Sequence, residues 1–300
     1  MRISLVKSIG IILLLVGGMG VPAFAQWPTG KVIEQRTVRS AILGKDVKYT
    51  IYLPADYNTS ERSYPVVYLL HGYSDDNTGW LQFGEINRLA DKAIADGTIP
   101  PMVIVMPNGD SSFYINSYDG KEKYEDFFVS EFIPAIEKTY RIKGEKRFRG
   151  VAGLSMGGYG TLIYTLKHPE LFSAGAALSA AVFDDSTIIK MPDIAYERIL
   201  GPLIGRGLKG GDRINSAMNA NSPLKIVATK SADELKKVRY WIDCGDDDGL
   251  SKGNCLLHIA LSDKGVPHEF RVRDGAHTWT YWRTGIIDGL QFIGQSFHQQ

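Results

Sequence analysis

Cysteine and clustered charge are both scarce in this sequence of 300 residues. Only Cys244 and Cys255 occur, so a framework of disulfides does not hold the fold together. One Cys244–Cys255 disulfide and two buried free thiols both remain open. The 34 Lys and Arg residues nearly balance the 33 Asp and Glu residues, and no basic stripe stands out. This balance argues against nucleic acid as a partner.

No apolar run is long enough to span a membrane, and the most prominent one lies near the N-terminus. Residues 1–25 read MRISLVKSIGIILLLVGGMGVPAFA, with two basic residues, an apolar run at 9–19 and a final Ala23-Phe24-Ala25. This pattern predicts a secretory signal peptide that is cleaved after Ala25. The run is short for a membrane-spanning helix, and no cysteine lies at the cleavage site. We therefore expect a secreted or periplasmic domain over residues 26–300, with no stable membrane insertion.

Internal repeats and low-complexity tracts are absent, and the remaining chain alternates between two kinds of segment. Period-two and wholly apolar segments predict strands, whereas longer segments with helical periodicity predict helices. The strands are expected at 31–42, 45–54, 64–72, 101–107, 146–153, 172–180, 238–245 and 267–275, and the helices at 84–97, 124–140, 159–169, 255–265 and 278–297. The first two strands form a hairpin. The alternation from Tyr64 onward predicts an α/β fold with a mostly parallel sheet and helices on both faces.

Residues 183–230 interrupt this alternation with glycine-rich stretches and short apolar runs. The interruption lies between two predicted strands, on the side where open α/β sheets bind ligands. A plain surface insertion is one interpretation. We favour a lid or pocket wall, because long connections in compact domains are usually functional or disordered.

The stretch GVAGLSMGGYG, residues 150–160, crowds glycines around Ser155 between a predicted strand and a predicted helix. A G-x-S-x-G motif in this context is typical of a nucleophile elbow, which presents a serine hydroxyl above the sheet on a strained turn. Flanking glycines are needed because side chains there would collide with the neighbouring elements. Ser155 is therefore the predicted nucleophile.

A serine nucleophile needs a base and an acid, which follow it in the order Ser, Asp or Glu, His in such folds. Of the six histidines, His277 lies after the last predicted strand and before the last predicted helix. His277 is therefore the predicted base. The acid is expected after the preceding strand, where Asp246, Asp247 and Asp248 occupy one loop, and the residues alone do not choose among them. The loop lacks the ligand spacing of an EF-hand, so we expect no metal.

An oxyanion intermediate needs two preorganised N–H donors. One is expected to be the backbone N–H of Met156, directly after the nucleophile. The other comes from the loop HGYSDDNTGW that follows an early central strand, and the backbone N–H of Tyr73 is the best placed there.

Several segments in order resemble one family. They are YLLHGYSDDNTGW, MPNGDSSFY, YEDFFVSEFIPAIEKTY, GLSMGGYG, HPELFSAGAALSA, WIDCGDDDGL and GVPHEFRVRDGAHTWTYW. Together they resemble the putative-esterase family of α/β-hydrolases, which includes feruloyl, acetylxylan and tributyrin-type esterases, S-formylglutathione hydrolase and mycolyltransferases. The resemblance implies an α/β-hydrolase fold from about Lys31 to the end. It also implies that Asp248 is the triad acid, although the Asp triplet departs from the family pattern and leaves Asp247 as a competitor.

These observations predict a secreted serine carboxylic-ester hydrolase without a metal or an organic cofactor. Its expected partner is a small-molecule or polysaccharide ester, of the feruloyl or acetyl type or with short acyl chains. Aromatic residues expected near the mouth, where they could stack on a sugar or an aromatic acyl group, are Trp80, Tyr114, Trp279 and Trp282. Acyl transfer to a sugar is the first alternative. The others are an S-formylglutathione hydrolase-like thioesterase, against which the export signal weighs, and a non-catalytic carbohydrate-binding protein.

Overall fold

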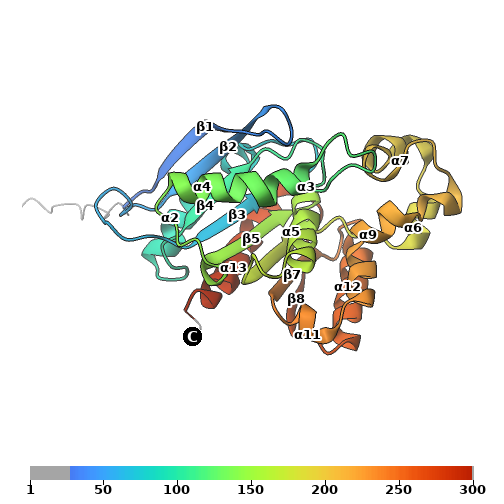
Figure 1. Cartoon of the computed structure of the whole chain (residues 1–300). Helices are drawn as coiled ribbons and strands as arrows, with labels where there is room; N and C mark the ends of the chain where they lie inside the picture. The colour runs from blue at the N-terminus through green and yellow to red at the C-terminus, as the bar shows by residue number, and fades with distance from the viewer. Residues whose placement is uncertain (1–27, 299–300) are drawn as a thin grey trace, which may run out of the picture.

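A computed structural model describes residues 28–298, so the predicted signal peptide lies outside the described residues. Eight strands form one sheet in the order β1-β2-β4-β3-β5-β6-β7-β8 (Figure 1). The strands are β1 (Lys31–Arg39), β2 (Asp46–Leu53), β3 (Val66–Leu70), β4 (Val103–Pro107), β5 (Arg149–Leu154), β6 (Ala174–Leu178), β7 (Arg239–Gly245) and β8 (His268–Arg273). All eight overlap the strands expected from the sequence.

The sheet is antiparallel at one side and parallel elsewhere. β1 pairs with β2, and β2 with β4, in antiparallel fashion. Every remaining pair, from β4–β3 to β7–β8, is parallel. The carboxyl ends of β3, β5, β7 and β8 therefore meet at one edge of the sheet, which is where open α/β sheets bind their ligands. The predicted fold class, the α/β-hydrolase arrangement of a mostly parallel sheet with helices, is confirmed.

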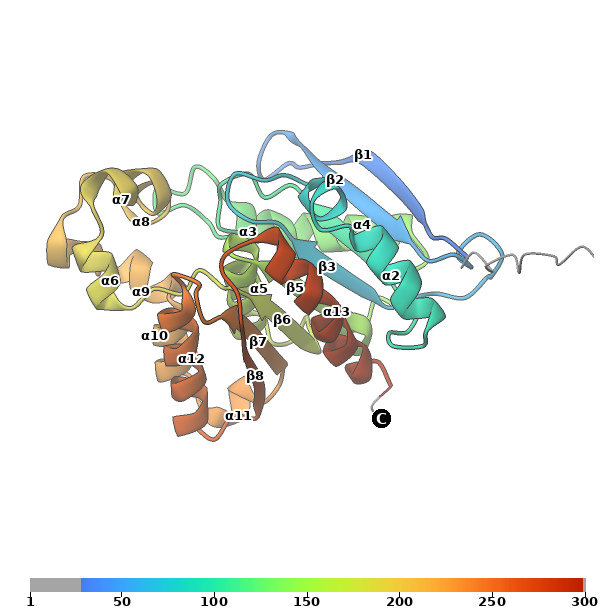
Figure 2. The same ribbon diagram turned by 180° about the vertical axis from the view of Figure 1, so that it is seen from behind.

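Helices cover both faces of the sheet. α2 and α13 lie on one face, and α4, α5 and α12 lie on the other (Figures 1 and 2). The main helices are α1 (Gly79–Gln82), α2 (Ile86–Ala95), α3 (Tyr124–Phe127), α4 (Ile133–Thr139), α5 (Met156–Lys167), α12 (Ser251–Asp263) and α13 (Trp279–Ser296). Single-turn 3₁₀ helices occur at Lys146–Phe148 and Gly210–Arg213.

Strand β3 shows why a strand in the middle of the sheet can be wholly apolar. Tyr68 and Leu70 belong to the apolar cluster beneath α4 and α5, while Val67 and Leu69 belong to the cluster beneath α2 and α13. Successive residues of a strand point to opposite faces, so a strand covered on both sides is mostly apolar, apart from buried side chains that have a partner. This double coverage keeps the central strands fixed beneath the functional edge.

The helix expected over residues 124–140 is interrupted rather than continuous. α3 and α4 are joined by a π-helical turn, Phe128–Phe132, and Pro134 lies in the first turn of α4. Proline has no N–H and its ring crowds the preceding turn, which opens the hydrogen-bond ladder there. The break therefore precedes the proline.

The segment over residues 183–230, expected as a lid or pocket wall, is mostly helical. Its helices are α6 (Asp185–Lys190), α7 (Asp193–Ile199), α8 (Gly201–Ile204), α9 (Ser216–Asn221) and α10 (Pro223–Thr229), followed by α11 (Ala232–Leu235). α6 to α9 extend beyond one side of the sheet (Figure 2). Four of the six helices, α6, α9, α10 and α11, begin with an Asp, Asn or Ser side chain that accepts the N–H of the third helical residue, and in α11 this cap is part of a full capping box.

Two further expectations concern the membrane and the cysteines. Within residues 28–298, no helix has the length and apolar character needed to cross a membrane. Cys244 and Cys255 are unpaired thiols, as in the second of the two cysteine alternatives, but only Cys244 is buried and Cys255 is partly exposed. Burial raises the pKa of the Cys244 thiol to about 12.

Candidate active site

Ser155 lies in a strained turn between β5 and α5. Its φ of 53° and ψ of −114° fall outside the regions that a side chain normally allows. The two flanking glycines make the turn possible. A β-carbon on Gly157 would lie 2.3 Å from the carbonyl oxygen of Leu70, and one on Gly153 would lie 2.5 Å from the carbonyl of Gly157. The sequence thus folds into a tight elbow that projects the hydroxyl of Ser155 above β3 and β5.

The side chains of Ser155, His277 and Asp248 form a hydrogen-bonded chain. Nε2 of His277 lies 2.9 Å from Oγ of Ser155, and Nδ1 lies 2.8 Å from Oδ2 of Asp248. The other carboxylate oxygen of Asp248 accepts the N–H of Leu250 at 2.8 Å. Burial by itself raises the pKa of Asp248, but hydrogen bonds from His277, Leu250 and Ser179 lower it below its ordinary value. Asp248 is therefore an ionised partner for His277.

The other aspartates near Asp248 do not bond to His277. Oδ1 of Asp246 accepts the N–H of Gly275 at 3.0 Å, and the N–H of Asp247 donates to the Gly275 carbonyl at 3.0 Å. These bonds tie the acid loop to the loop that carries the histidine. Asp243, inside β7 and fully buried, pairs with Nε of Arg273 at 2.8 Å. Sequence reasoning missed these bracing roles, because they depend on which loops meet in space.

The predicted oxyanion donors lie on segments that meet at the elbow. A β-carbon placed on Gly72 would lie 3.7 Å from Cβ of Ser155, so the loop after β3 passes directly beside the nucleophile. Within residues 28–298, neither the N–H of Tyr73 nor that of Met156 donates a hydrogen bond to a protein acceptor. Two unpaired amides beside a strained serine can receive an anionic oxygen.

Two aromatic residues that were expected at the mouth belong to the core instead. Nε1 of Trp80 donates to the carbonyl of Leu70 at 2.9 Å, and the hydroxyl of Tyr114 donates to the carbonyl of His71 at 3.0 Å. The exposed fractions of the two side chains are 1% and 0%. The expectation that Trp80 and Tyr114 bind substrate is therefore wrong, because both rings are used to hold the end of β3 in place.

His71 also supports this loop from below. Its Nε2 accepts the N–H of Gly109 at 2.8 Å, which leaves the proton on Nδ1 to donate to the carbonyl of Gly72, also at 2.8 Å. Burial lowers the pKa of His71, which keeps it neutral. The sequence around His71 gave no sign that this histidine is buried and joins two loops.

The other two aromatic residues lie on the histidine side. Trp282 is buried, donates from Nε1 to Oγ of Ser179 at 3.0 Å, and presents its ring to His277 at a centroid distance of 4.8 Å. Trp279 is partly buried and packs against Phe83, whose side chain is 48% exposed, at 5.8 Å. Trp282 therefore contacts the imidazole from within the core and is not exposed for stacking on a ligand, whereas Trp279 is partly exposed.

The helical segment 183–230 contacts the loop that carries Tyr73, and the residues just before the segment contact the nucleophile turn. The hydroxyl of Tyr73 donates to the carbonyl of Arg198 at 3.3 Å, and the N–H of Ala181 donates to the carbonyl of Ser155 at 3.0 Å. A small apolar cavity lies between body and insertion, and its lining includes Phe113, Tyr159, Ala181, Leu200, Leu203 and Met218. The surface on this side of Ser155 is therefore apolar.

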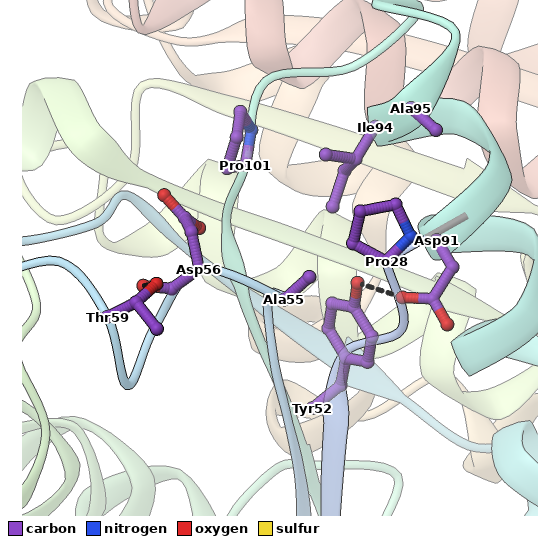
Figure 3. A pocket seen from close by; sticks show the side chains of 9 residues that line it. All are labelled: Pro28, Tyr52, Ala55, Asp56, Thr59, Asp91, Ile94, Ala95 and Pro101. Carbon is purple, nitrogen blue, oxygen red and sulfur yellow. Dashed lines mark hydrogen bonds between the residues drawn. The ribbon is translucent and has the colours of Figure 1, made fainter. Parts of the chain in front are cut away.

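A larger cavity of about 320 Å³ opens at the opposite end of the sheet, near the start of β4 (Figure 3). Tyr52 and Asp91 line it and share a hydrogen bond of 2.8 Å. None of its lining residues belongs to the elbow, the triad or the oxyanion loop. This cavity is therefore not the candidate active site, which the hydrogen-bonded side chains of Ser155, His277 and Asp248 identify instead.

A mostly parallel sheet with a serine elbow and a Ser–His–Asp chain at its carboxyl edge defines an α/β-hydrolase. The Esterase family model, described as putative esterase, matches residues 40–293. The chain belongs to this family.

Known relatives agree with this assignment. The chain is 36% identical over 158 residues to an endo-1,4-beta-xylanase/feruloyl esterase of Xylanibacter ruminicola, which is 50% of this chain but only 22% of that protein. It is 28% identical to the diacylglycerol acyltransferase/mycolyltransferase Ag85A of Mycobacterium leprae, covering 96% of this chain and 91% of that protein. A solved ferulic acid esterase is 35% identical with a TM-score of 0.76, covering 90% of this chain and all of that one.

Proposed function

We propose that this protein is an exported serine esterase that cleaves carboxylic esters through an acyl-enzyme at Ser155. The observation that carries the proposal is the chain from Ser155 Oγ to His277 Nε2 at 2.9 Å and from His277 Nδ1 to Asp248 at 2.8 Å. This is the geometry that a serine nucleophile, a general base and an orienting acid require.

In the first half-reaction, Oγ of Ser155 attacks the acyl carbon while Nε2 of His277 takes its proton. Asp248 holds the imidazole with Nε2 toward the serine and stabilises the imidazolium that forms. The negative oxygen of the tetrahedral intermediate accepts hydrogen bonds from the backbone N–H groups of Tyr73 and Met156. His277 then gives its proton to the oxygen of the leaving alcohol, and the ester C–O bond breaks.

In the second half-reaction, water replaces the alcohol. His277 removes a proton from water, whose oxygen attacks the acyl carbon of the ester at Ser155. The same two amides stabilise the second tetrahedral intermediate, and the proton on His277 returns to Oγ of Ser155 as the acid leaves. The proton transfers require only the side chains of Ser155, His277 and Asp248.

The proposed substrates are ester-decorated carbohydrates of the feruloyl or acetyl type, or short-chain acyl esters. Feruloyl and ferulic acid esterases among the relatives support this class. Trp279, partly exposed two residues after His277, is proposed to contact a sugar or an aromatic acyl group. The predicted signal peptide fits a substrate outside the cell.

The helical segment 183–230 is proposed to act as a pocket wall for the acyl group. Its apolar residues Leu200, Leu203 and Met218 line the same small cavity as Phe113 and Tyr159, beside the nucleophile turn. A closed apolar wall favours the acyl part of an ester over a charged group.

The test is hydrolysis by the mature protein of p-nitrophenyl esters of rising chain length, methyl ferulate and acetylated xylan, with Ser155→Ala as the control. We expect turnover of at least one ester class by the wild type and a loss of several orders of magnitude in the variant. Similarity to a mycolyltransferase makes acyl transfer the second candidate. Added sugar acceptors separate the two, because a transferase yields an acyl sugar whereas a hydrolase yields only free acid.

A further inference from the structure

The loop that carries Tyr73 contains two adjacent carboxylates in contrasting surroundings. Oδ1 of Asp76 accepts both the N–H and the hydroxyl of Thr78 at 2.7 Å, and although burial opposes this, these bonds lower the pKa of Asp76. Asp75 is half-buried, and within residues 28–298 neither of its carboxylate oxygens has a hydrogen-bond donor. Burial first, and the charge of Asp76 second, raise the pKa of Asp75.

Asp75 lies beside the nucleophile. Its Oδ2 and Cβ of Ser155 are 3.8 and 3.7 Å from the point that a β-carbon on Gly72 would occupy. Cδ1 of the buried Leu154 lies 2.7 Å from the same point, so the side chains of Asp75 and Ser155 both lie near this methyl group, at the end of β3 where the predicted oxyanion loop begins. On its other side, Cγ of Asp75 lies 3.1 Å from the corresponding point on Gly79, the first residue of α1.

The loop that presents Asp75 is fixed in place. The N–H of Asp75 donates to the carbonyl of Gly72 at 3.2 Å, and Nδ2 of the buried Asn77 donates to Oγ1 of Thr50 at 2.8 Å. Ser74, between them, adopts a left-handed φ of 71°. A carboxylate that is partly desolvated without a donor costs stability, so a rigid loop that holds one there needs an explanation.

The position of Asp75 favours the alcohol side of the ester. The chain runs from Asp75 through α1 to Phe83, which packs on Trp279, two residues after the histidine that protonates the leaving alcohol. The apolar cavity is lined by Phe113, on which the ring of Tyr73 packs at 6.0 Å, and Asp75 is not among its lining residues. A carboxylate on the alcohol side has only acceptors to offer, and it suits a leaving group that carries hydroxyl donors.

We infer that Asp75 is a specificity-determining residue that accepts a hydrogen bond from a free hydroxyl group on the sugar part of the ester. The inference rests on the proposed esterase function. A sugar supplies the donor that the protein lacks at this position, so Asp75 distinguishes esters of polyols from esters of alcohols without further hydroxyls.

The test compares two acetates that share the acyl group and differ in the alcohol. One is a mono-O-acetylated methyl xyloside, and the other is cyclohexyl acetate, a six-membered ring without hydroxyls. The measured quantity is the ratio of kcat/KM for the sugar ester to that for the cyclohexyl ester. The variants are Asp75→Asn and Asp75→Leu, and the matched control is Asp76→Asn on the same loop.

We expect the ratio to fall by roughly 10-fold or more in both Asp75 variants, as the loss of a hydrogen bond to a charged group implies. The Asp76→Asn control should keep the ratio within about twofold, because its carboxylate already has partners in the protein. The thermal midpoint of Asp75→Asn should not fall below that of the wild type, since the variant removes a desolvated charge.

An unchanged ratio in both Asp75 variants would overturn the inference, as would an equal loss on both acetates together with a lower thermal midpoint, which would indicate a structural role. Failure of the proposed function has a different signature. In that case, the wild type itself turns over neither acetate and Ser155 does not react with a fluorophosphonate.

Discussion

At the scale of single residues, the three aspartates in the loop after β7, Asp246 to Asp248, have different roles. Only Asp248 reaches Nδ1 of His277, and its two neighbours are bonded to the histidine loop. We expect Asp248→Asn to lower kcat by roughly 10⁴, because an amide favours the wrong imidazole tautomer. Asp247→Asn should cost less than about tenfold. Ester hydrolysis at saturating substrate measures both, with circular dichroism as the check on folding.

Activity in Asp248→Asn together with an inactive Asp247→Asn would mean that the acid has been assigned one residue too late. Activity in both variants would require an acid from another part of the chain.

Asp75 makes a second prediction at this scale, through the pH dependence of stability. Its pKa in the folded protein is raised by burial and by Asp76, so its charged form opposes folding. Asp75→Asn should therefore be more stable than the wild type near pH 7. The difference should shrink as the pH falls through the raised pKa toward about 3.9, the ordinary value, below which both states are protonated. Urea unfolding at several pH values measures this, and a variant that is less stable throughout would contradict it.

At the scale of elements, the elbow depends on glycines that admit the end of β3. Gly157→Ala would place a β-carbon 2.3 Å from the Leu70 carbonyl, which the backbone must move to relieve. We expect a loss of about 1–3 kcal/mol in the free energy of unfolding and a larger loss of activity, since the displaced strand end carries the oxyanion loop. Denaturant unfolding and ester hydrolysis measure the two effects.

Gly211→Ala is the matched control, because a β-carbon there meets nothing within 4 Å. If the two alanine variants had equal stability and equal activity, the close approach of Gly157 to Leu70 would not be the reason that a glycine is needed at position 157.

The helical segment 183–230 is organised around one buried cation. The side chain of Arg213 is 1% exposed, and it donates to the carbonyls of Leu208, Ile188 and Met191. Arg213→Met would keep much of the volume but leave these carbonyls unpaired. We expect hydrogen exchange across residues 184–215 to accelerate while exchange in the central strands stays unchanged.

Arg206→Met is the control for the loss of charge, because the Arg206 side chain is 62% exposed. Unaltered protection of the segment in Arg213→Met would contradict its role as the organising residue.

At the scale of the whole molecule, sequence patterns predicted the sheet and the triad because both depend on local signals. Wholly apolar runs predicted buried strands such as β3, and the G-x-S-x-G motif predicted the elbow at Ser155. The order of residues along the chain then selected His277. The resemblance to a family was needed to select Asp248, since neighbours on a loop differ only in direction.

Other features could not be predicted because they depend on distant contacts. Trp80 and Tyr114 belong to two of the segments that resemble the family, yet both side chains are buried and donate hydrogen bonds to the carbonyls of Leu70 and His71. The helices of segment 183–230 had readable caps at Asp184, Asn215 and Ser222, but their short length left little periodicity.

The central claim is that Ser155 is an activated nucleophile, and covalent labelling tests it most directly. The folded mature protein is treated with a fluorophosphonate, digested, and analysed by mass spectrometry to locate the adduct. The account predicts one adduct on Ser155 in the wild type, none after prior denaturation, none in Ser155→Ala, and much slower labelling in His277→Ala. An adduct on another residue, or undiminished ester hydrolysis by Ser155→Ala, would contradict it.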